Sequence, residues 1–436
     1  MGHVAIKDAY TKLGNKIDNL HVRAPMNETF YELLKELYTP EEADFVVKMP
    51  FLLSNLDRVR KFTKTDKDEA RRLLDTLCEK GLVMDLFLRG EYRYMPSPMM
   101  IGIFEFTMMR TGEDLNSKRW AELYHEYLES GAYYHANFED WTKTWIARTL
   151  PHEEALADHV EILDYDRASY LIDQAEKYAV GICSCRHKKE HTETERCDVP
   201  LNTCTCLGGA ADYVIRHNMA KEISKTEIHE IFERSKELGL VFSADNVQKR
   251  IMYICHCCGC CCTIMEGLTK HGMTNSVVTS NFIASIDDEK CKGCGKCAKA
   301  CHTQAIEMIP IESNTPESKE KKKPQLDTSI CIGCGVCSLK CETGALKLVE
   351  REKRVILPET TFQRVILQCL ERGTLQNQLF DKPESITHKT MRAVVGGFLK
   401  LTPVKRALMS DMLRSTFLST MGTGIKILGK GYIHEC

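Results

Sequence analysis

Two runs of cysteine with identical spacing constrain this chain more than any other feature of its sequence. The first is Cys291-x2-Cys294-x2-Cys297-x3-Cys301, and the second is Cys331-x2-Cys334-x2-Cys337-x3-Cys341. In each run a tight loop can turn the first three side chains toward one centre, and the glycines between them let the backbone pass close to that centre. The pattern therefore predicts thiolate ligation of metal at two places.

The other cysteines favour a metal-binding chain over a disulfide scaffold. Of 22 cysteines, all but Cys78, Cys369 and Cys436 lie between Cys183 and Cys341. Disulfide scaffolds are normally short secreted chains, whereas this chain has 436 residues and no signal-peptide core at its N-terminus. A formal charge of −2 gives no general attraction to nucleic acid, and no apolar run is long enough to span a bilayer. We therefore expect a cytoplasmic protein in an anaerobic or strongly reducing setting.

The doubled motif resembles the two-cluster [4Fe–4S] ferredoxins of bacteria over residues 286–349. In that family the fourth cysteine of each run ligates the other cluster, so the resemblance implies two mixed sets of ligands. Cluster I takes Cys291, Cys294, Cys297 and Cys341, and cluster II takes Cys331, Cys334, Cys337 and Cys301. His302 and Glu342 stand where the family usually has proline after the fourth cysteine. Zinc in place of iron is the structural alternative.

A second cysteine field lies upstream of the doubled motif. It begins with Cys183, Cys185, Cys197, Cys204 and Cys206, and between Cys255 and Cys262 six of eight residues are cysteine. Buried thiols are common singly, but this density has no structural explanation without metal. Eleven thiolates can hold two further [4Fe–4S] clusters or one cluster of unusual shape, with zinc in part of the field as the alternative. His256 is the better histidine candidate in this region, because cysteines flank it.

The whole arrangement resembles a group of poorly characterised iron–sulfur proteins of anaerobes. They join a winged-helix-like N-terminus, a CxCRH segment with two later cysteines, an ICxCCGCCC segment and a dicluster ferredoxin. The matching stretches here are Cys183–His187, Cys197–Pro200, Cys204 and Ile254–Cys262, and Cys206 is not a fixed part of the pattern, so its role stays open. The resemblance implies further iron–sulfur ligands, without dividing them among clusters, at Cys183, Cys185, Cys197, Cys204, Cys255, Cys257, Cys258 and Cys261.

The N-terminal region predicts several helices followed by a hairpin. Thr39-Pro40 is a helix start, residues 65–80 form a helix that Gly81 ends, and Arg89-Gly90 is the turn of the hairpin. Over residues 27–96 this order resembles a winged helix-turn-helix domain. The helix in the recognition position, residues 66–80, carries five acids against four bases, whereas DNA phosphates need a positive face. We therefore expect this region to pack or to dock a partner rather than to bind DNA.

The sequence predicts an α+β protein of several domains. These are a winged-helix-like domain at 1–99, a helical domain at 100–180, a mixed α/β cysteine-rich domain at 181–285, a dicluster ferredoxin domain at 286–349 and a basic helical extension at 350–436. Residues 351–436 hold fourteen Lys and Arg against seven Asp and Glu, with amphipathic helices expected at 360–372, 386–400 and 403–420. Basic helices of this kind can cap the clusters, dock acidic partners or lie on a membrane.

Electron transfer is the function that these features favour. No Walker loop is present and no GxGxxG follows an expected strand, so neither nucleotide nor flavin binding is supported and no catalytic residue is assigned. The chain is expected to work with a redox protein partner, a larger oxidoreductase complex, and its C-terminal helices allow a peripheral position at the inner face of the membrane. Two alternatives stay open: a reductase with a catalytic atypical cluster at Cys255–Cys262, and a redox-responsive winged-helix regulator.

Overall fold

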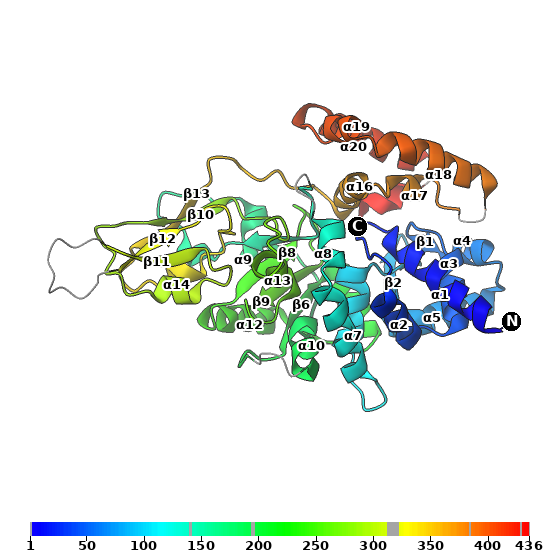
Figure 1. Cartoon of the computed structure of the whole chain (residues 1–436), viewed down its shortest axis with the longest axis horizontal. Coiled ribbons are helices and arrows are strands. Elements are labelled where there is room, and N and C mark those ends of the chain that lie inside the picture. Colours follow the sequence, from blue (N-terminus) through cyan, green and yellow to red (C-terminus); the bar gives the residue numbers. More distant parts are fainter. Residues whose placement is uncertain are drawn as a thin grey trace.

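The computed structural model describes residues 2–138, 142–192, 197–311, 322–382, 385–427 and 430–435. The molecule is elongated, with a small cysteine-rich module at one end, a six-stranded sheet in the middle and the N-terminal helices at the other end (Figure 1). The C-terminal helices lie along one side of the N-terminal region (Figure 1). Helices and sheets are mixed along the chain, in agreement with the predicted α+β class.

The N-terminal region contains five helices and a small sheet. The helices are α1 (Gly2–Asp18), α2 (Glu28–Leu37), α3 (Pro40–Lys48), α4 (Leu56–Thr63) and α5 (Lys67–Glu79). Strands β1 (Ser54–Asn55), β2 (Val83–Leu88) and β3 (Glu91–Pro96) pair in the order β1-β3-β2. The predicted capping box of Thr39 with Glu42 is present, and Arg89 and Gly90 both have positive φ at the hairpin turn. The winged-helix assignment of this region stays a prediction.

The hairpin β2–β3 packs against another part of the same chain. The guanidinium of Arg216, at the end of α11 (Gly208–Arg216), donates to Asp85 on β2 at 2.6 and 3.0 Å and lies over the Tyr92 ring. The hydroxyl of Tyr213 donates to the carbonyl of Val83 at 2.9 Å. The hairpin is thus held against α11 by internal contacts, and its Phe87 stays exposed at 58 %.

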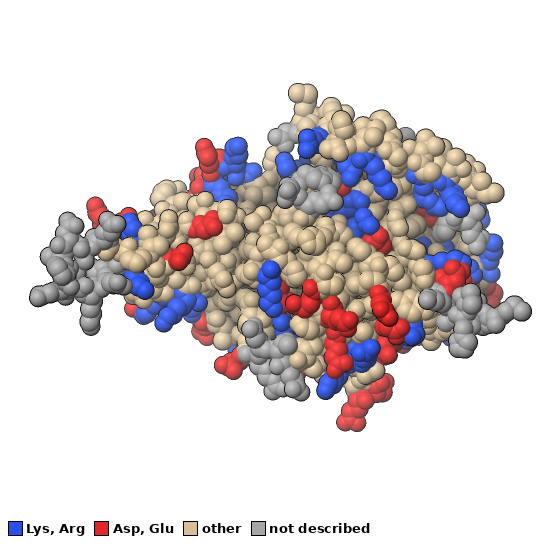
Figure 2. Space-filling view, in the orientation of Figure 1, with Lys and Arg blue, Asp and Glu red and all other residues tan. Residues whose placement is uncertain are grey.

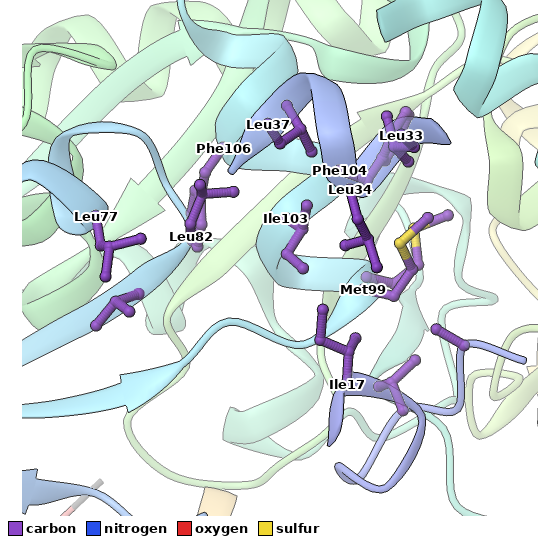
Figure 3. Packing of buried hydrophobic residues seen from close by; sticks show 14 of the residues in the cluster. Ile17, Leu33, Leu34, Leu37, Leu77, Leu82, Met99, Ile103, Phe104 and Phe106 are labelled. Carbon is purple, nitrogen blue, oxygen red and sulfur yellow. The ribbon is translucent and has the colours of Figure 1, made fainter. Parts of the chain in front are cut away.

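A continuous apolar core joins the N-terminal helices to the middle of the molecule. It includes α6 (Phe104–Met109), α7 (Ser117–Glu129) and α8 (Ala132–Asn137), which follow a distorted turn at Met99–Ile103. Figure 3 shows buried side chains of this core from α1, α2, α5 and α6. The same cluster reaches Cys206 and Tyr213 beside the large sheet, so the N-terminal region is not a separate hydrophobic unit.

Six antiparallel strands form the central sheet, in the order β4-β8-β9-β6-β5-β7. They are β4 (Ala147–Leu150), β5 (Tyr178–Ile182), β6 (Asn202–Leu207), β7 (Ala220–Ile223), β8 (Val241–Asp245) and β9 (Tyr253–Cys257). The helices between and beyond them are α9 (Ala168–Asp173), α10 (Ser184–Thr192), α11, α12 (Lys225–Glu237) and α13 (Thr263–Thr269), with short helical turns at Glu153–Ala155 and Asp164–Asp166.

Strand β4 lies in a segment that the sequence predicts to be mainly helical. Its Arg148 is fully buried and forms an ion pair with Asp166 at 3.0 Å. This buried charge interrupts the apolar pattern that otherwise marks a strand covered on both faces. Because β4 and β5 share one sheet with the strands of residues 202–257, the expected helical and cysteine-rich domains are joined by strand pairing.

The cysteine-rich module has two similar halves. Strand β10 (Phe282–Ile286) pairs with β13 (Leu346–Glu350), and β11 (Ile306–Pro310) pairs with β12 (Lys322–Leu326). Each cysteine run ends in a short helix, α14 (Lys296–Ala300) in the first half and α15 (Val336–Leu339) in the second. Most of the charged linker between the halves lies outside the described residues.

The C-terminal region is helical, as expected. Its helices are α16 (Thr361–Arg372), α17 (Leu375–Leu379), α18 (Ile386–Leu399), α19 (Thr402–Leu408), α20 (Asp411–Ile427) and a short turn at Gly431–Glu435. The single helix predicted at 403–420 is two helices, and the break falls where Ser410 Oγ donates to the carbonyl of Ala407 at 2.6 Å. Within the described ranges, no helix is both long and apolar enough to cross a membrane.

Candidate iron–sulfur and metal sites

Two cavities lie inside the cysteine-rich module, and four cysteines line each of them. One cavity is lined by Cys291, Cys294, Cys297 and Cys341. The other is lined by Cys301, Cys331, Cys334 and Cys337. The fourth cysteine of each run therefore lies with the first three of the other run, which is the partition that the ferredoxin resemblance implies. We name these the outer and the inner cavity.

Glycines allow the loops to close around the two cavities. Gly293 and Gly333 have φ of 65° and 69°, and a Cβ on either would lie 2.2 Å or less from a backbone carbonyl oxygen of Lys322 or Phe282. No other residue fits these positions without moving the loop. Four thiols around a cavity are the donor set that a [4Fe–4S] cluster takes, so the residues present fit this group. Their assignment as ligands stays a prediction.

The inner cavity faces the central sheet, and His302 fixes this contact. Its Nδ1 accepts the backbone N–H of Gly259 at 3.0 Å, and its Nε2 donates to the carbonyl of Gly239 at 2.6 Å. The first bond requires an unprotonated Nδ1, so the ring is the neutral tautomer with hydrogen on Nε2. Proline, the usual residue at this position, could make neither bond. His302, which stands where the family usually has proline, therefore joins the module to the second cysteine field.

Seven cysteines of the second field gather beside the central sheet. Side chains two residues apart share a face of a strand, which places Cys204 and Cys206 of β6 together and Cys255 and Cys257 of β9 together. Cys204 and Cys255 are opposite each other in neighbouring strands. Cys183 and Cys185 follow β5, and Cys262 precedes α13. We name these seven residues the cysteine row.

Hydrogen bonding between neighbours sets the pKa values along the cysteine row. The sulfurs follow one another in the order Cys183, Cys185, Cys262, Cys257, Cys255, Cys204 and Cys206. Accepting hydrogen bonds from neighbouring thiols lowers the pKa of Cys185, Cys257 and Cys204. Donating those bonds, together with burial, raises the pKa of Cys183, Cys262, Cys255 and Cys206. Seven adjacent thiols are a donor set of the kind that iron–sulfur clusters take, so the residues present fit such a group, and their assignment as ligands stays a prediction.

The remaining four cysteines of the field form a compact group of their own. The Sγ atoms of Cys197, Cys258, Cys260 and Cys261 all lie within 4.8 Å of one another. Three of the separations are 3.8 Å for Cys197–Cys258, 3.6 Å for Cys197–Cys261 and 3.7 Å for Cys260–Cys261. A hydrogen bond from Cys261 and the nearby Arg186 guanidinium lower the pKa of Cys258 to about 5 against the effect of burial. We name this set the four-cysteine group.

His256 does not join either set of thiols, so its selection as the better histidine candidate was wrong. It alternates with Cys255 and Cys257 along β9 and therefore points to the opposite face of the sheet. There its Nδ1 lies 2.8 Å from Ser235 Oγ and its Nε2 lies 3.2 Å from Thr205 Oγ1. Burial lowers its pKa to about 3, as expected for a neutral histidine in a core.

Sequence reasoning left out three cysteines that the structure places within these sets. Cys206 lies in the cysteine row beside Cys204, and strand periodicity alone would have placed it there. Cys262 also belongs to the row, while Cys260 belongs to the four-cysteine group. These two lie at the end of an irregular loop, where spacing along the sequence gives no direction for a side chain.

Comparisons with known proteins identify one part of the chain. A family model described as a 4Fe-4S dicluster domain matches residues 290–354, which contain the doubled cysteine motif. No curated protein and no solved structure matches the chain. The match supports a ferredoxin-like module that binds iron–sulfur clusters, and such a domain suggests electron transfer through [4Fe–4S] clusters.

Proposed function

We propose that this chain is an electron-transfer subunit that conducts electrons between the outer cavity and a further iron–sulfur centre at the cysteine row. Bound [4Fe–4S] clusters gain and lose electrons, at potentials that the surrounding hydrogen bonds and solvent exposure set. One observation carries the proposal: Cys334 of the inner cavity packs in the same apolar cluster as Cys257 and Cys262 of the cysteine row. The three sites therefore follow one another through the molecule.

The protein gives this path an exposed end and a buried end. Cys294, at the outer cavity, is exposed, whereas Cys331 and Cys337 at the inner cavity are buried. The cysteine row lies between the sheet and the core shared with the N-terminal helices, and its Cys206, Cys257 and Cys262 are buried. An external donor or acceptor can thus approach the outer cavity, while His302 holds the inner cavity against the sheet.

The C-terminal helices are our proposed docking surface for a partner oxidoreductase. Helices α18 and α20 expose large apolar side chains, including Ile386 at 83 %, Val394 at 64 % and Met412 at 85 %. Lys and Arg side chains lie on the same helices (Figure 2). A surface both apolar and basic fits an acidic protein partner or the inner face of a membrane. The internal contacts of the β2–β3 hairpin support the view that DNA is not a partner.

Iron and sulfide analysis of anaerobically purified protein tests the proposal. The ferredoxin module alone accounts for about eight iron atoms per chain, so a further centre at the cysteine row requires more than eight. Cys297→Ala should remove the outer cluster and slow the reduction of the remaining centres by an external donor. Cys369→Ala, a buried cysteine in α16 away from both cavities, is the matched control. The proposal is refuted if the count stops at eight or if Cys297→Ala leaves the reduction rate unchanged.

A reductase is the second candidate, because an apolar cavity lies beside the cysteine row. It is lined by Cys204, Cys206 and Cys255 together with apolar side chains such as Phe106 and Phe362. An apolar disulfide or another two-electron acceptor fits such a cavity. Rapid mixing of the dithionite-reduced protein with a small aliphatic disulfide distinguishes the two functions. Reoxidation at the rate of free dithionite-reduced ferredoxin favours the electron-transfer subunit, and faster, saturable reoxidation favours the reductase.

A further inference from the structure

We infer that the four-cysteine group is a zinc site, in which Cys197, Cys258, Cys260 and Cys261 hold one tetrahedral ion rather than part of an iron–sulfur cluster. The inference goes beyond the proposed electron transfer and does not depend on it, because zinc has no redox chemistry. It rests on the separation of the four sulfur atoms, on their comparison with the ferredoxin cavities and on the charge beside them.

The sulfur separations match those around a single ion. With Zn–S bonds of about 2.3 Å, the sulfurs of a tetrahedral site are about 3.8 Å apart. Three separations within the group are 3.6, 3.7 and 3.8 Å, and all four sulfurs lie within 4.8 Å of one another. One ion at the centre therefore reaches every thiolate. A [4Fe–4S] cluster binds each thiolate to a different iron, so its ligands must stand apart around a cavity.

The ferredoxin module of the same structure shows what cluster ligands look like here. Its eight cysteines line two cavities, and no four of them form a group as compact as this one among the described residues. Across the described ranges only one other set of possible ligands is as compact as the four-cysteine group, and it consists of Cys78, Asp85 and His217. There the carboxylate of Asp85 is already paired with Arg216 at 2.6 Å. The four-cysteine group consists of thiols alone, the ligand set of closed structural zinc sites.

A buried arginine stabilises the charge that such a site would carry. Four thiolates and one divalent ion leave a net charge of −2, which needs compensation in a partly buried position. The guanidinium of Arg186 lies beside Cys258. Its two terminal nitrogens donate to Thr203 Oγ1 at 2.5 Å and to the carbonyl of His256 at 2.6 Å, which fixes its direction.

The position of the group indicates what the ion does. Cys197 is 61 residues from Cys258, so one ion ties two distant segments together. The loop that carries Cys258, Cys260 and Cys261 also carries Gly259, whose N–H is bound by His302 of the ferredoxin module. Zinc at this place therefore stabilises the surface on which the inner cavity docks.

Crossed substitutions in the full-length protein test the inference. Cys260→Ser alters the four-cysteine group, and Cys255→Ser alters the cysteine row. Zinc and iron per chain are measured by mass spectrometry after anaerobic purification. We expect one zinc per wild-type chain, loss of zinc with retention of iron in Cys260→Ser, and retention of zinc with loss of iron in Cys255→Ser. Absence of zinc from the wild-type protein, or loss of iron in Cys260→Ser, would overturn the inference.

X-ray absorption at the zinc edge keeps the inference testable if Cys260→Ser does not fold. The wild-type spectrum should show four sulfur neighbours at about 2.3 Å and no iron in the next shell. Nitrogen or oxygen ligands, or a nearby iron, would contradict it. This result is independent of the proposed function. If the electron-transfer assay fails while the zinc spectrum is as expected, the electron-transfer proposal is refuted and the zinc site stands.

Discussion

Replacement of His302 by alanine should loosen the contact between the ferredoxin module and the loop of residues 258–262 while every thiol remains. The substitution removes the bond to the Gly259 N–H at 3.0 Å and the bond to the Gly239 carbonyl at 2.6 Å. A hydrogen bond contributes about 0.5–1.5 kcal/mol, and an unsatisfied buried group costs about 1–3 kcal/mol. Because Gly239 is buried, the expected loss at this contact is about 2–4 kcal/mol.

Hydrogen exchange measures this loss where it occurs. A loss of about 2 kcal/mol in the free energy of local opening accelerates exchange of the Gly259 amide by about 30-fold. Mass spectrometry of the segment 254–262 in anaerobic protein follows this amide. His302→Gln keeps one acceptor and one donor and should recover part of the protection. His229→Ala, at a histidine exposed on α12, is the control and should exchange as the wild type does.

Unchanged exchange of Gly259 in His302→Ala would refute the reasoning. It would mean that the module is held by other contacts and that the histidine is incidental. Exchange that accelerates equally in His229→Ala would point to general destabilisation instead of a local contact.

Three further predictions concern the cluster loops, a buried lysine and the C-terminal surface. Gly333→Ala should remove about half of the ferredoxin iron, because a Cβ at this position would lie 2.0 Å from a carbonyl oxygen. Gly344 has a similar φ but no atom near its Cβ position, so Gly344→Ala is the control and should retain the iron. Burial lowers the pKa of Lys16 from 10.5 to about 7. Between these two pH values the unfolded chain binds one proton more than the folded chain, so the free energy of unfolding should rise by about 1.4 kcal/mol per pH unit relative to Lys16→Met. Denaturant titrations at several pH values measure this dependence, and the same pH dependence in Lys16→Met would contradict the prediction. Phe398→Ser should weaken binding to anionic vesicles several-fold. Phe87→Ser is the control and should bind as the wild type does, because Phe87 is exposed to the same degree, 58 % against 59 % for Phe398, but lies outside the C-terminal helices. Equal binding by both variants would indicate that the C-terminal surface contacts a protein partner instead of a membrane.

The sequence predicted the parts of the fold that short-range patterns determine. The capping box at Thr39, the Arg89-Gly90 turn and the helix ended by Gly81 are present because each depends on residues within one turn of the chain. Strand β4 was not foreseen, because its buried Arg148 is neutralised by Asp166, eighteen positions away. Such a partner cannot be recognised from the strand itself.

For the candidate sites, too, the sequence predicted what a local pattern determines and missed what depends on contacts between distant residues. The partition of the eight ferredoxin cysteines followed from a resemblance with fixed spacing, and the two cavities agree with it. The separation of the upstream field into a row and a compact group did not follow, because Cys197 meets Cys258 across 61 residues. The prediction for His256 relied on its cysteine neighbours in the sequence. It overlooked that neighbouring side chains of a strand point to opposite faces, so His256 points away from Cys255 and Cys257.

Strands β10 and β13 bring the two ends of the ferredoxin module side by side, with Phe282 opposite Glu350. Just outside this pair, Asn281 accepts the N–H of Arg351 at 2.9 Å and donates to Asp166 at 2.8 Å, so the flanking residues stay anchored to the central part. The module is thus an insert whose ends are about one strand spacing, 4.8 Å, apart. A two-residue turn could close the chain after its removal. A different electron carrier with adjacent ends could be grafted in its place if it also met the host surface that His302 and Cys334 now contact.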